Sequence, residues 1–349
     1  MKQVRSVGID VTKKCTLRCK HCYNYSAESK GVPNREMSDG ELTELVKEAL
    51  EITPESICLC GGEPLTRKDV LESIVEYGAK NYPVTSINMV SNGELMDRST
   101  AERFVRAGIN SVQISMDGAT AATHDWLRNR EGAFDFAVQA LRNLEEQRRL
   151  QKRDFNISVS FCPTKKNYHE LADAVKLAES LGVDTFSTQP LMLMGRATEN
   201  LKEYVMDRSE YKQYITEIKQ LQKMMGDRIK IEWGDPIDHL MKDSINDMVF
   251  LQVNAEGKLA ISPYIPIAFG DVVKHRLGDY IDFDIDRIWG HPLFEYLRLR
   301  TVTPEKMNVS RHSGFVPEAG TGMLCFDVLE PGWEDEMDKL YIKIKKEFK

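Results

Sequence analysis

The sequence lacks long runs of apolar residues. No run of 18 or more occurs in its 349 residues, and a helix that crosses a bilayer needs roughly that length. The opening segment MKQVRSVGID returns to polar residues too early to supply the apolar stretch of a signal peptide. We therefore expect a cytoplasmic protein without a membrane partner.

An excess of positive charge is also missing. Lys and Arg number 47 against 54 Asp and Glu, which gives a formal net charge of -7. Proteins that bind nucleic acids usually carry a basic surface that contacts the phosphate backbone. We therefore expect no nucleic-acid partner.

Cysteines are few and irregularly spaced, so the seven thiols do not resemble a disulfide framework. Three of them, Cys15, Cys19 and Cys22, form a C-x3-C-x2-C run, and clustered thiols in a reducing compartment are typically metal ligands or catalytic groups. Structural zinc needs four ligands, and His21 is a poor fourth one because it adjoins Cys22. An iron–sulfur cube held by three cysteines would keep one iron open for an outside ligand.

Short β-branched strands alternate with amphipathic helices through the first two thirds of the chain. This rhythm predicts an α/β fold with parallel strands and right-handed crossovers, either an open sheet or a partly closed barrel. The alternation ends near Met225, and we expect a hairpin over 248–264 and a helix over 334–349 beyond it. The predicted strands are Val4–Ile9, Ser56–Cys60, Thr85–Ser91, Ser111–Met116, Asn156–Phe161 and Asp184–Gln189.

Three polar motifs follow predicted strands at their carboxyl ends, where α/β folds place their sites. They are CGGEP, SNG and SMDG, and each is also compatible with an ordinary turn. Glycines allow a close backbone approach, and Glu63 could accept hydrogen bonds from an ammonium group. Together with the cysteine run, the motifs should meet at one edge of the sheet.

The run C15-T-L-R-C19-K-H-C22-Y, with these later motifs in order, resembles the radical S-adenosylmethionine (radical SAM) superfamily. The resemblance implies a partial (β/α)6 barrel and one [4Fe–4S] cluster held by Cys15, Cys19 and Cys22. The open iron of such a cluster binds S-adenosylmethionine. Its reductive cleavage then releases a 5′-deoxyadenosyl radical that abstracts hydrogen from an unactivated position.

The same resemblance assigns cofactor-binding residues. The GGEP loop would receive the amino group of S-adenosylmethionine, the SNG and SMDG residues would line its ribose and methionyl region, and Tyr23 would pack near the adenine. An arginine in HDWLRNREGAFD would pair with the carboxylate, although an arginine facing water is the simpler reading. The complete predicted set is Tyr23, Gly61, Gly62, Glu63, Pro64, Ser91, Asn92, Ser115, Asp117 and Arg128.

Three other cysteines precede the C-terminal region. Cys58 and Cys60 alternate along one strand, so both should point to the same face, where we expect core packing. Cys162 ends the fifth strand at the presumed mouth of the barrel. Core packing is the plain expectation for it, and a catalytic role as hydrogen-atom donor to a substrate radical is the alternative.

The C-terminal part resembles the α+β SPASM/twitch extension of peptide- and carbohydrate-modifying members, through the hairpin, an LGD segment and Trp289. We therefore predict a core over 1–226 and an extension over 227–349. The cysteines that bind auxiliary clusters in such relatives are absent: Ser262 or a neighbour stands at the first position, and only Cys325 follows Cys162. We expect the extension to act as a substrate-binding lid, with these candidates facing the pocket: Trp233, Asp235, Tyr264 and His275.

The resemblance predicts an enzyme that abstracts hydrogen from a ribosomally made precursor peptide. A radical SAM dehydrogenase, epimerase or decarboxylase of a sugar, nucleoside or antibiotic intermediate is the alternative substrate class. A non-catalytic iron–sulfur or S-adenosylmethionine-binding scaffold is the alternative from another class. The implied partners are a flavodoxin- or ferredoxin-type electron donor and, for a peptide substrate, a separate leader-peptide-binding protein.

Overall fold

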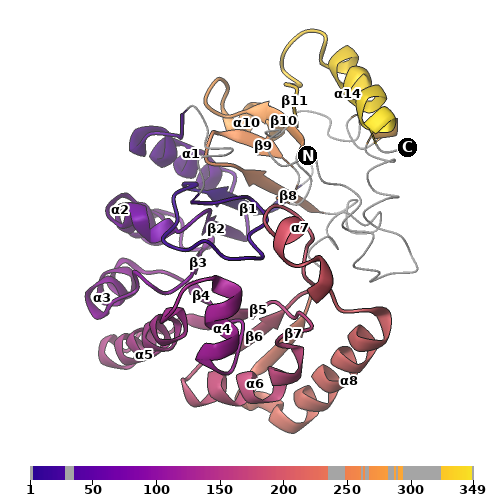
Figure 1. The fold of residues 1–349 in the computed structure, drawn as a ribbon. Helices are drawn as coiled ribbons and strands as arrows, with labels where there is room; N and C mark the ends of the chain where they lie inside the picture. Colours follow the sequence, from indigo (N-terminus) through magenta and orange to yellow (C-terminus); the bar gives the residue numbers. More distant parts are fainter. Residues whose placement is uncertain are drawn as a thin grey trace.

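A single sheet of 11 strands organises the chain (Figure 1), in the order β11-β10-β9-β8-β1-β2-β3-β4-β5-β6-β7. The computed structural model describes residues 3–27, 35–234, 248–260, 262–263, 267–281, 287, 290–293 and 324–347. The strands are β1 (Gln3–Asp10), β2 (Ser56–Cys60), β3 (Ser86–Ser91), β4 (Ser111–Ser115), β5 (Asn156–Phe161), β6 (Thr185–Thr188), β7 (Lys230–Trp233), β8 (Met248–Val253), β9 (Lys258–Ala260), β10 (Ile267–Asp271) and β11 (Leu324–Cys325).

The central strands are parallel, as the strand–helix rhythm predicted. Strands β1 to β7 pair in sequence order, each parallel to the next, and β8 returns to pair in parallel with the opposite side of β1. All six predicted strands are present, each within one residue of its predicted bounds. Strand β7, which the sequence did not predict, continues the sheet beyond β6.

Helices form an outer layer around this sheet (Figure 1). Their ends follow local sequence: Ser38 and Glu41 form a reciprocal capping box at the start of α1, and Gly108 ends α3 in the left-handed conformation, with a φ of 99°. The helices are α1 (Asp39–Glu51), α2 (Lys68–Asn81), α3 (Arg98–Ala107), α4 (Ala121–Arg128), α5 (Ala133–Gln151), α6 (Leu171–Ser180), α7 (Ala197–Asn200), α8 (Arg208–Met225), α10 (Leu277–Ile281) and α14 (Trp333–Glu347), with short 3-10 turns η1 (Pro64–Arg67), η2 (Tyr168–Glu170), η3 (Lys202–Tyr204) and η4 (Gly226–Arg228).

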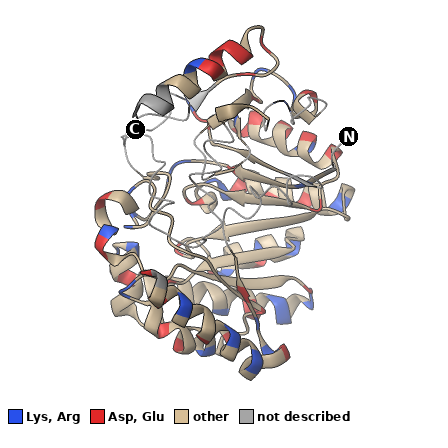
Figure 2. Ribbon diagram, turned by 90° about the vertical axis from the view of Figure 1, so that its right-hand side faces the viewer, with Lys and Arg blue, Asp and Glu red and all other residues tan. Residues whose placement is uncertain are grey.

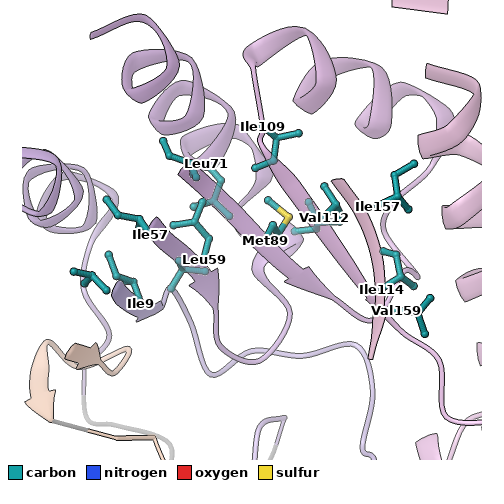
Figure 3. Close-up of a cluster of buried hydrophobic side chains, with 14 of the residues drawn as sticks. Ile9, Ile57, Leu59, Leu71, Met89, Ile109, Val112, Ile114, Ile157 and Val159 are labelled. Carbon is teal, nitrogen blue, oxygen red and sulfur yellow. The ribbon is translucent and has the colours of Figure 1, made fainter. Parts of the chain in front are cut away.

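The apolar core lies between the strands and this helical layer. Side chains of a strand alternate between its two faces, and on β2 the fully buried ones are Ile57 and Leu59. Figure 3 shows them together with Ile9 of β1 and Leu71 of α2. Charged residues lie mainly on helices and outer loops, and few of them lie on the strands (Figure 2). The other face of the strands is therefore left for polar residues.

The C-terminal region extends the same sheet. Strands β8 and β9 form the predicted antiparallel hairpin, whose turn is fixed by Asn254 because its Oδ1 accepts hydrogen bonds from the backbone N–H groups of Glu256 and Lys258. The predicted terminal helix is α14. One sheet contains strands from both sides of residue 226. The division into 1–226 and 227–349 therefore stays a prediction. Among the described residues, no helix is long and apolar enough to cross a bilayer. Three residues named from the sequence lie outside the described part: Asp235, Tyr264 and Trp289.

Candidate functional site

The three clustered cysteines lie on the loop that follows β1, at the carboxyl end of the central parallel strands. All three are free thiols; Cys19 is buried, and Cys15 and Cys22 are half-buried. The loop turns back on itself because the N–H of Cys22 donates a hydrogen bond to the carbonyl of Cys19 at 3.2 Å. The predicted ligands are thus gathered on one short, folded segment.

The spacing of the three cysteine sulfur atoms bears on whether the loop would bind a zinc ion or an iron–sulfur cluster. The three sulfurs do not all lie within 4.8 Å of one another, whereas around one zinc ion, with bonds of about 2.3 Å, they would lie roughly 3.8 Å apart. His21 does not complete a zinc site either, since its Nε2 lies 3.5 Å from Oδ2 of Asp117. A cubic cluster binds each thiolate through a separate iron, so it does not require the three sulfurs to surround one ion.

The surroundings of the sulfurs also suit a positively charged inorganic group. Burial raises the pKa of the Cys15 thiol to about 12, so its thiolate form requires a bound cation. Nδ2 of Asn92 lies 3.8 Å from the Cys15 sulfur, and Nη1 of Arg128 lies 3.8 Å from the Cys19 sulfur. These weak donors orient toward the ligating atoms. Cys15, Cys19 and Cys22 therefore fit a [4Fe–4S] cluster.

The glycines of the GGEP loop pack against the segment that leads into the cysteines. The N–H of Gly62 donates to the carbonyl of Thr12 at 2.7 Å, and the N–H of Glu63 donates to that of Lys14 at 2.7 Å. A Cβ on Gly62 would lie 2.1 Å from the Lys14 oxygen, which leaves no room for a side chain. The close approach expected of these glycines is thus to the chain's own backbone. Pro64, the first residue of η1, is buried beside them.

Glu63 is fully buried, and its carboxylate accepts hydrogen bonds from the end of β3, from the residue after it and from η1. Its Oε1 accepts hydrogen bonds from Ser91 Oγ at 2.8 Å and from the N–H of Leu65 at 3.1 Å. Its Oε2 accepts one from the N–H of Asn92 at 2.8 Å. Burial raises the pKa of Glu63 to about 7 despite these donors. The GGEP and SNG motifs, predicted to meet, are therefore joined through one carboxylate.

Arg128 and Asp117 form a buried ion pair beside Cys19. Nη2 of Arg128 lies 2.5 Å from Oδ2 of Asp117. Burial raises the pKa of Asp117, but the charge of Arg128 and its other neighbours hold that pKa below its usual value. Oδ1 of Asp117 accepts a hydrogen bond from the N–H of Cys162 at 2.8 Å. Nε of Arg128 is buried and has no hydrogen-bond acceptor among the described residues.

Arg196 is a site residue that the sequence did not single out. It is buried, and its Nε donates to the carbonyl of Cys19 at 2.8 Å while its Nη1 donates to that of Ser26 at 2.7 Å. Next to it, a Cβ on Gly195 would lie 2.4 Å from the carbonyl oxygen of Cys22. The segment PLMLMGRA, which contains Arg196, carries no spacing signal for this contact, because the contact joins residues 177 positions apart.

The structure also brings together a histidine pair that sequence spacing could not reveal. Nδ1 of His124, on α4, accepts a hydrogen bond from the backbone N–H of Asp117 at 3.0 Å. Nε2 of His21 lies 3.5 Å from Oδ2 of the Asp117 carboxylate. Burial lowers the pKa of each histidine to about 4, so both are neutral near pH 7. They surround the ion pair without adding charge.

Two of the three remaining cysteines lie in a different environment from the predicted one. Cys58 and Cys60 share a face, as expected, but that face is not the apolar core: both are half-buried, and their sulfurs lie 3.1 Å apart. The prediction that this pair packs in the core is therefore wrong, because the β2 side chains that face the helices are those of Ile57 and Leu59. Cys162 is half-buried against a small apolar cluster that includes Leu127. Its role as a hydrogen-atom donor stays a prediction.

Other predicted residues occupy varied positions. Tyr23 is half-buried against the core, and Ser115 is nearly buried at the end of β4. Trp233 packs its ring against Tyr211 and Tyr214. His275 lies between β10 and α10, and its Nε2 is 3.4 Å from Oε1 of Glu330. Contact of any of these residues with a ligand stays a prediction.

Comparisons with known proteins agree with this fold. Residues 9–178 match the model of the radical SAM superfamily. An AdoMet-dependent heme synthase of Methanosarcina barkeri is 33% identical over 196 residues, which are 56% of this chain and 53% of that protein. The sporulation killing factor maturation protein SkfB of Bacillus subtilis is 30% identical over 230 residues, 65% of this chain and 52% of that protein. The chain thus spans about half the length of the curated relatives it matches.

A solved structure gives the same picture at the level of fold. SuiB of Streptococcus suis bound to S-adenosylmethionine superposes with a TM-score of 0.67 over 88% of this chain and 72% of that chain, at 12% identity. Residues 9–178 therefore form a radical SAM domain, and the relatives of the chain include the maturation protein SkfB. The cofactors of the superfamily are a [4Fe–4S] cluster and S-adenosylmethionine.

Proposed function

We propose that this protein reductively cleaves S-adenosylmethionine and abstracts hydrogen from a ribosomally made precursor peptide. The observation that carries the proposal is the loop of three free thiols, whose sulfurs are spaced too widely for one zinc ion. A bound cluster would supply an electron and an open coordination position for S-adenosylmethionine.

The chain's own residues would hold and orient these groups. Cys15, Cys19 and Cys22 would ligate the cluster, and the buried Nε of Arg128 would donate to the S-adenosylmethionine carboxylate. The ion pair with Asp117 fixes the guanidinium, since a paired arginine loses little freedom on binding. Glu63 would offer its oxygens to the ammonium group, although each already accepts a hydrogen bond from the chain.

Two substrate classes remain in view. A precursor peptide is supported by the relative named as a maturation protein, which matches 65% of this chain. A small molecule, the alternative predicted from the sequence, is supported by the relative named as a heme synthase, which has the higher identity of 33%. The two are separated by incubating the protein with each substrate class and asking which one couples S-adenosylmethionine cleavage to product formation.

The cysteine loop also suits an acidic electron donor of the flavodoxin or ferredoxin type. Lys14 and Arg18 are exposed on it, and Lys20 lies 4.0 Å above the ring of Trp126. Basic side chains next to the cluster would attract a negatively charged partner and speed its association. A leader-peptide-binding partner stays part of the proposal for a peptide substrate.

The test is anaerobic reconstitution with iron and sulfide, reduction with dithionite and addition of S-adenosylmethionine. We expect a brown protein that forms 5′-deoxyadenosine and methionine. The triple change of Cys15, Cys19 and Cys22 to Ser should abolish both colour and product, and Cys325→Ser on β11 is the matched control. A colourless protein, or one with zinc at the loop and no cleavage, would refute the proposal and favour a scaffold.

A further inference from the structure

The face of the sheet that points away from the helices is lined with small polar side chains. On β2 this face carries Cys58 and Cys60, because Ile57 and Leu59 point into the core. The neighbouring strands place polar residues at equivalent alternate positions: Ser6, Asn88, Gln113, Ser158 and Ser187. Such a surface offers hydrogen bonds and little apolar contact.

One acidic residue on this face is not satisfied by the chain. Asp10 ends β1 directly opposite Cys60, and only 8% of it is exposed. Its Oδ1 has no hydrogen-bond partner, while the side chain of Gln252 bonds the carboxyl group. Gln252 reaches it by crossing Gly8, where a Cβ would lie 2.1 Å from Oε1 of Gln252. Among the described residues, this arrangement leaves one buried carboxyl oxygen of Asp10 without a partner.

Among the described residues, no ion pair balances the charge of Asp10. No Lys, Arg or His nitrogen of the described residues lies within 4.0 Å of it, and the basic residue that acts on it, Lys13, lies 3.5 Å from Oε1 of Glu256 through its Nζ. Burial raises the pKa of Asp10 to about 7. A buried carboxylate that lacks partners is costly, and a donor or a cation from outside would remove that cost.

We propose that Asp10 is a substrate-binding residue that accepts a hydrogen bond from an ammonium or amide N–H group of the substrate. The inference rests on the proposed function and specifies the substrate's chemistry at this face. Gln252 would hold the carboxyl group in place, and the half-buried thiols of Cys58 and Cys60 would border the bound group. A substrate that presented a carboxylate here would meet like charge at close range, so donor-bearing groups such as those of a peptide fit better.

The two thiols next to Asp10 provide the readout. In the anaerobic, cluster-loaded protein, iodoacetamide alkylation of the peptide carrying Cys58 and Cys60 is followed by mass spectrometry. The probes are n-butylammonium and n-butyrate, which match in shape and differ in charge. We expect n-butylammonium to slow alkylation and n-butyrate to leave it unchanged. Equal protection by both probes, or protection by neither up to their solubility, would overturn the inference.

Asp10→Asn is the decisive variant, since it keeps the shape of the side chain and the contact with Gln252. We expect it to weaken the protection by n-butylammonium about tenfold, the size expected for one lost charge-assisted hydrogen bond. Ser56→Ala, on the same face beside Ser6, is the matched control and should protect like the wild type. Unchanged protection in Asp10→Asn would overturn the inference.

A measurement on the unaltered protein guards against a variant that does not fold. The ratio of alkylation rates with and without n-butylammonium should rise as pH falls from 8 to 6, because Asp10 becomes protonated and protection is lost. The other groups around Asp10 are Lys13, Gln252, which does not titrate, and Cys60, which stays a neutral thiol because its contact with Cys58 and its burial raise its pKa. A pH-independent ratio counts against Asp10. Absence of 5′-deoxyadenosine from the wild type would refute the proposed function separately.

Discussion

Nε of Arg196 lies 2.8 Å from the carbonyl oxygen of Cys19, although 177 positions separate the two residues in the sequence. The same guanidinium bonds Ser26, so one side chain spans the cysteine loop. Arg196 precedes α7, and its own N–H donates to the carbonyl of Cys22 at 2.9 Å. The geometry of the predicted cluster ligands thus depends on a residue far along the chain.

We predict that Arg196→Met loosens the cysteine loop. Two buried carbonyl groups would lose their charged donor, which costs roughly 1–3 kcal/mol each. The measurement is the rate at which the reconstituted protein loses iron to a chelator under anaerobic conditions, and we expect a several-fold increase. Arg130→Met, at an exposed arginine paired with Glu94, is the matched control. Equal rates in the two variants would show that Arg196 does not hold the loop.

Asp117→Asn should destabilise the protein strongly. It would leave the Arg128 guanidinium buried without its counter-charge, and breaking such a pair costs about 3–5 kcal/mol. The apparent free energy of unfolding from anaerobic urea titration measures the loss. Adding Arg128→Met to this variant should restore part of it, because the unpaired charge is gone. A loss below about 1 kcal/mol for the single variant would mean that solvent reaches the pair, as at surface ion pairs.

Sequence reasoning went furthest where the pattern is local. Strand positions followed from short β-branched runs, and the meeting of the GGEP and SNG motifs followed from the common direction of parallel strands. It failed where a contact is set by packing between distant segments. That Cys58 and Cys60 share one face of β2 was predicted correctly, but their packing in the apolar core was not, because the position of the helices decides which face is apolar. Likewise, the unpaired oxygen of Asp10 depends on Gln252, a strand partner from the C-terminal region.

Gly62→Ala should disrupt the cysteine loop more than its size suggests. The added Cβ would lie 2.1 Å from a backbone oxygen of Lys14, and backbone cannot swing away as a flexible side chain can. We expect a lower iron content after reconstitution and a lower thermal midpoint. Gly234→Ala is the control, because nothing lies within 4 Å of a Cβ there. If both variants bind iron like the wild type, the GGEP loop does not position the cysteines.

Glu63 gives the protein a pH dependence of defined sign. Burial raises its pKa from 4.5 to about 7, so between these values the folded protein holds a proton that the unfolded chain releases. The free energy of unfolding should therefore fall as pH rises from about 4.5 to 7, by up to roughly 1.4 kcal/mol per pH unit from this group. Glu63→Gln cannot titrate, so its profile should be flatter than that of the wild type over this range. Glu44→Gln, at an exposed residue of α1, should keep the wild-type slope. Parallel profiles for the wild type and Glu63→Gln would show that the three hydrogen bonds to the carboxylate outweigh its burial.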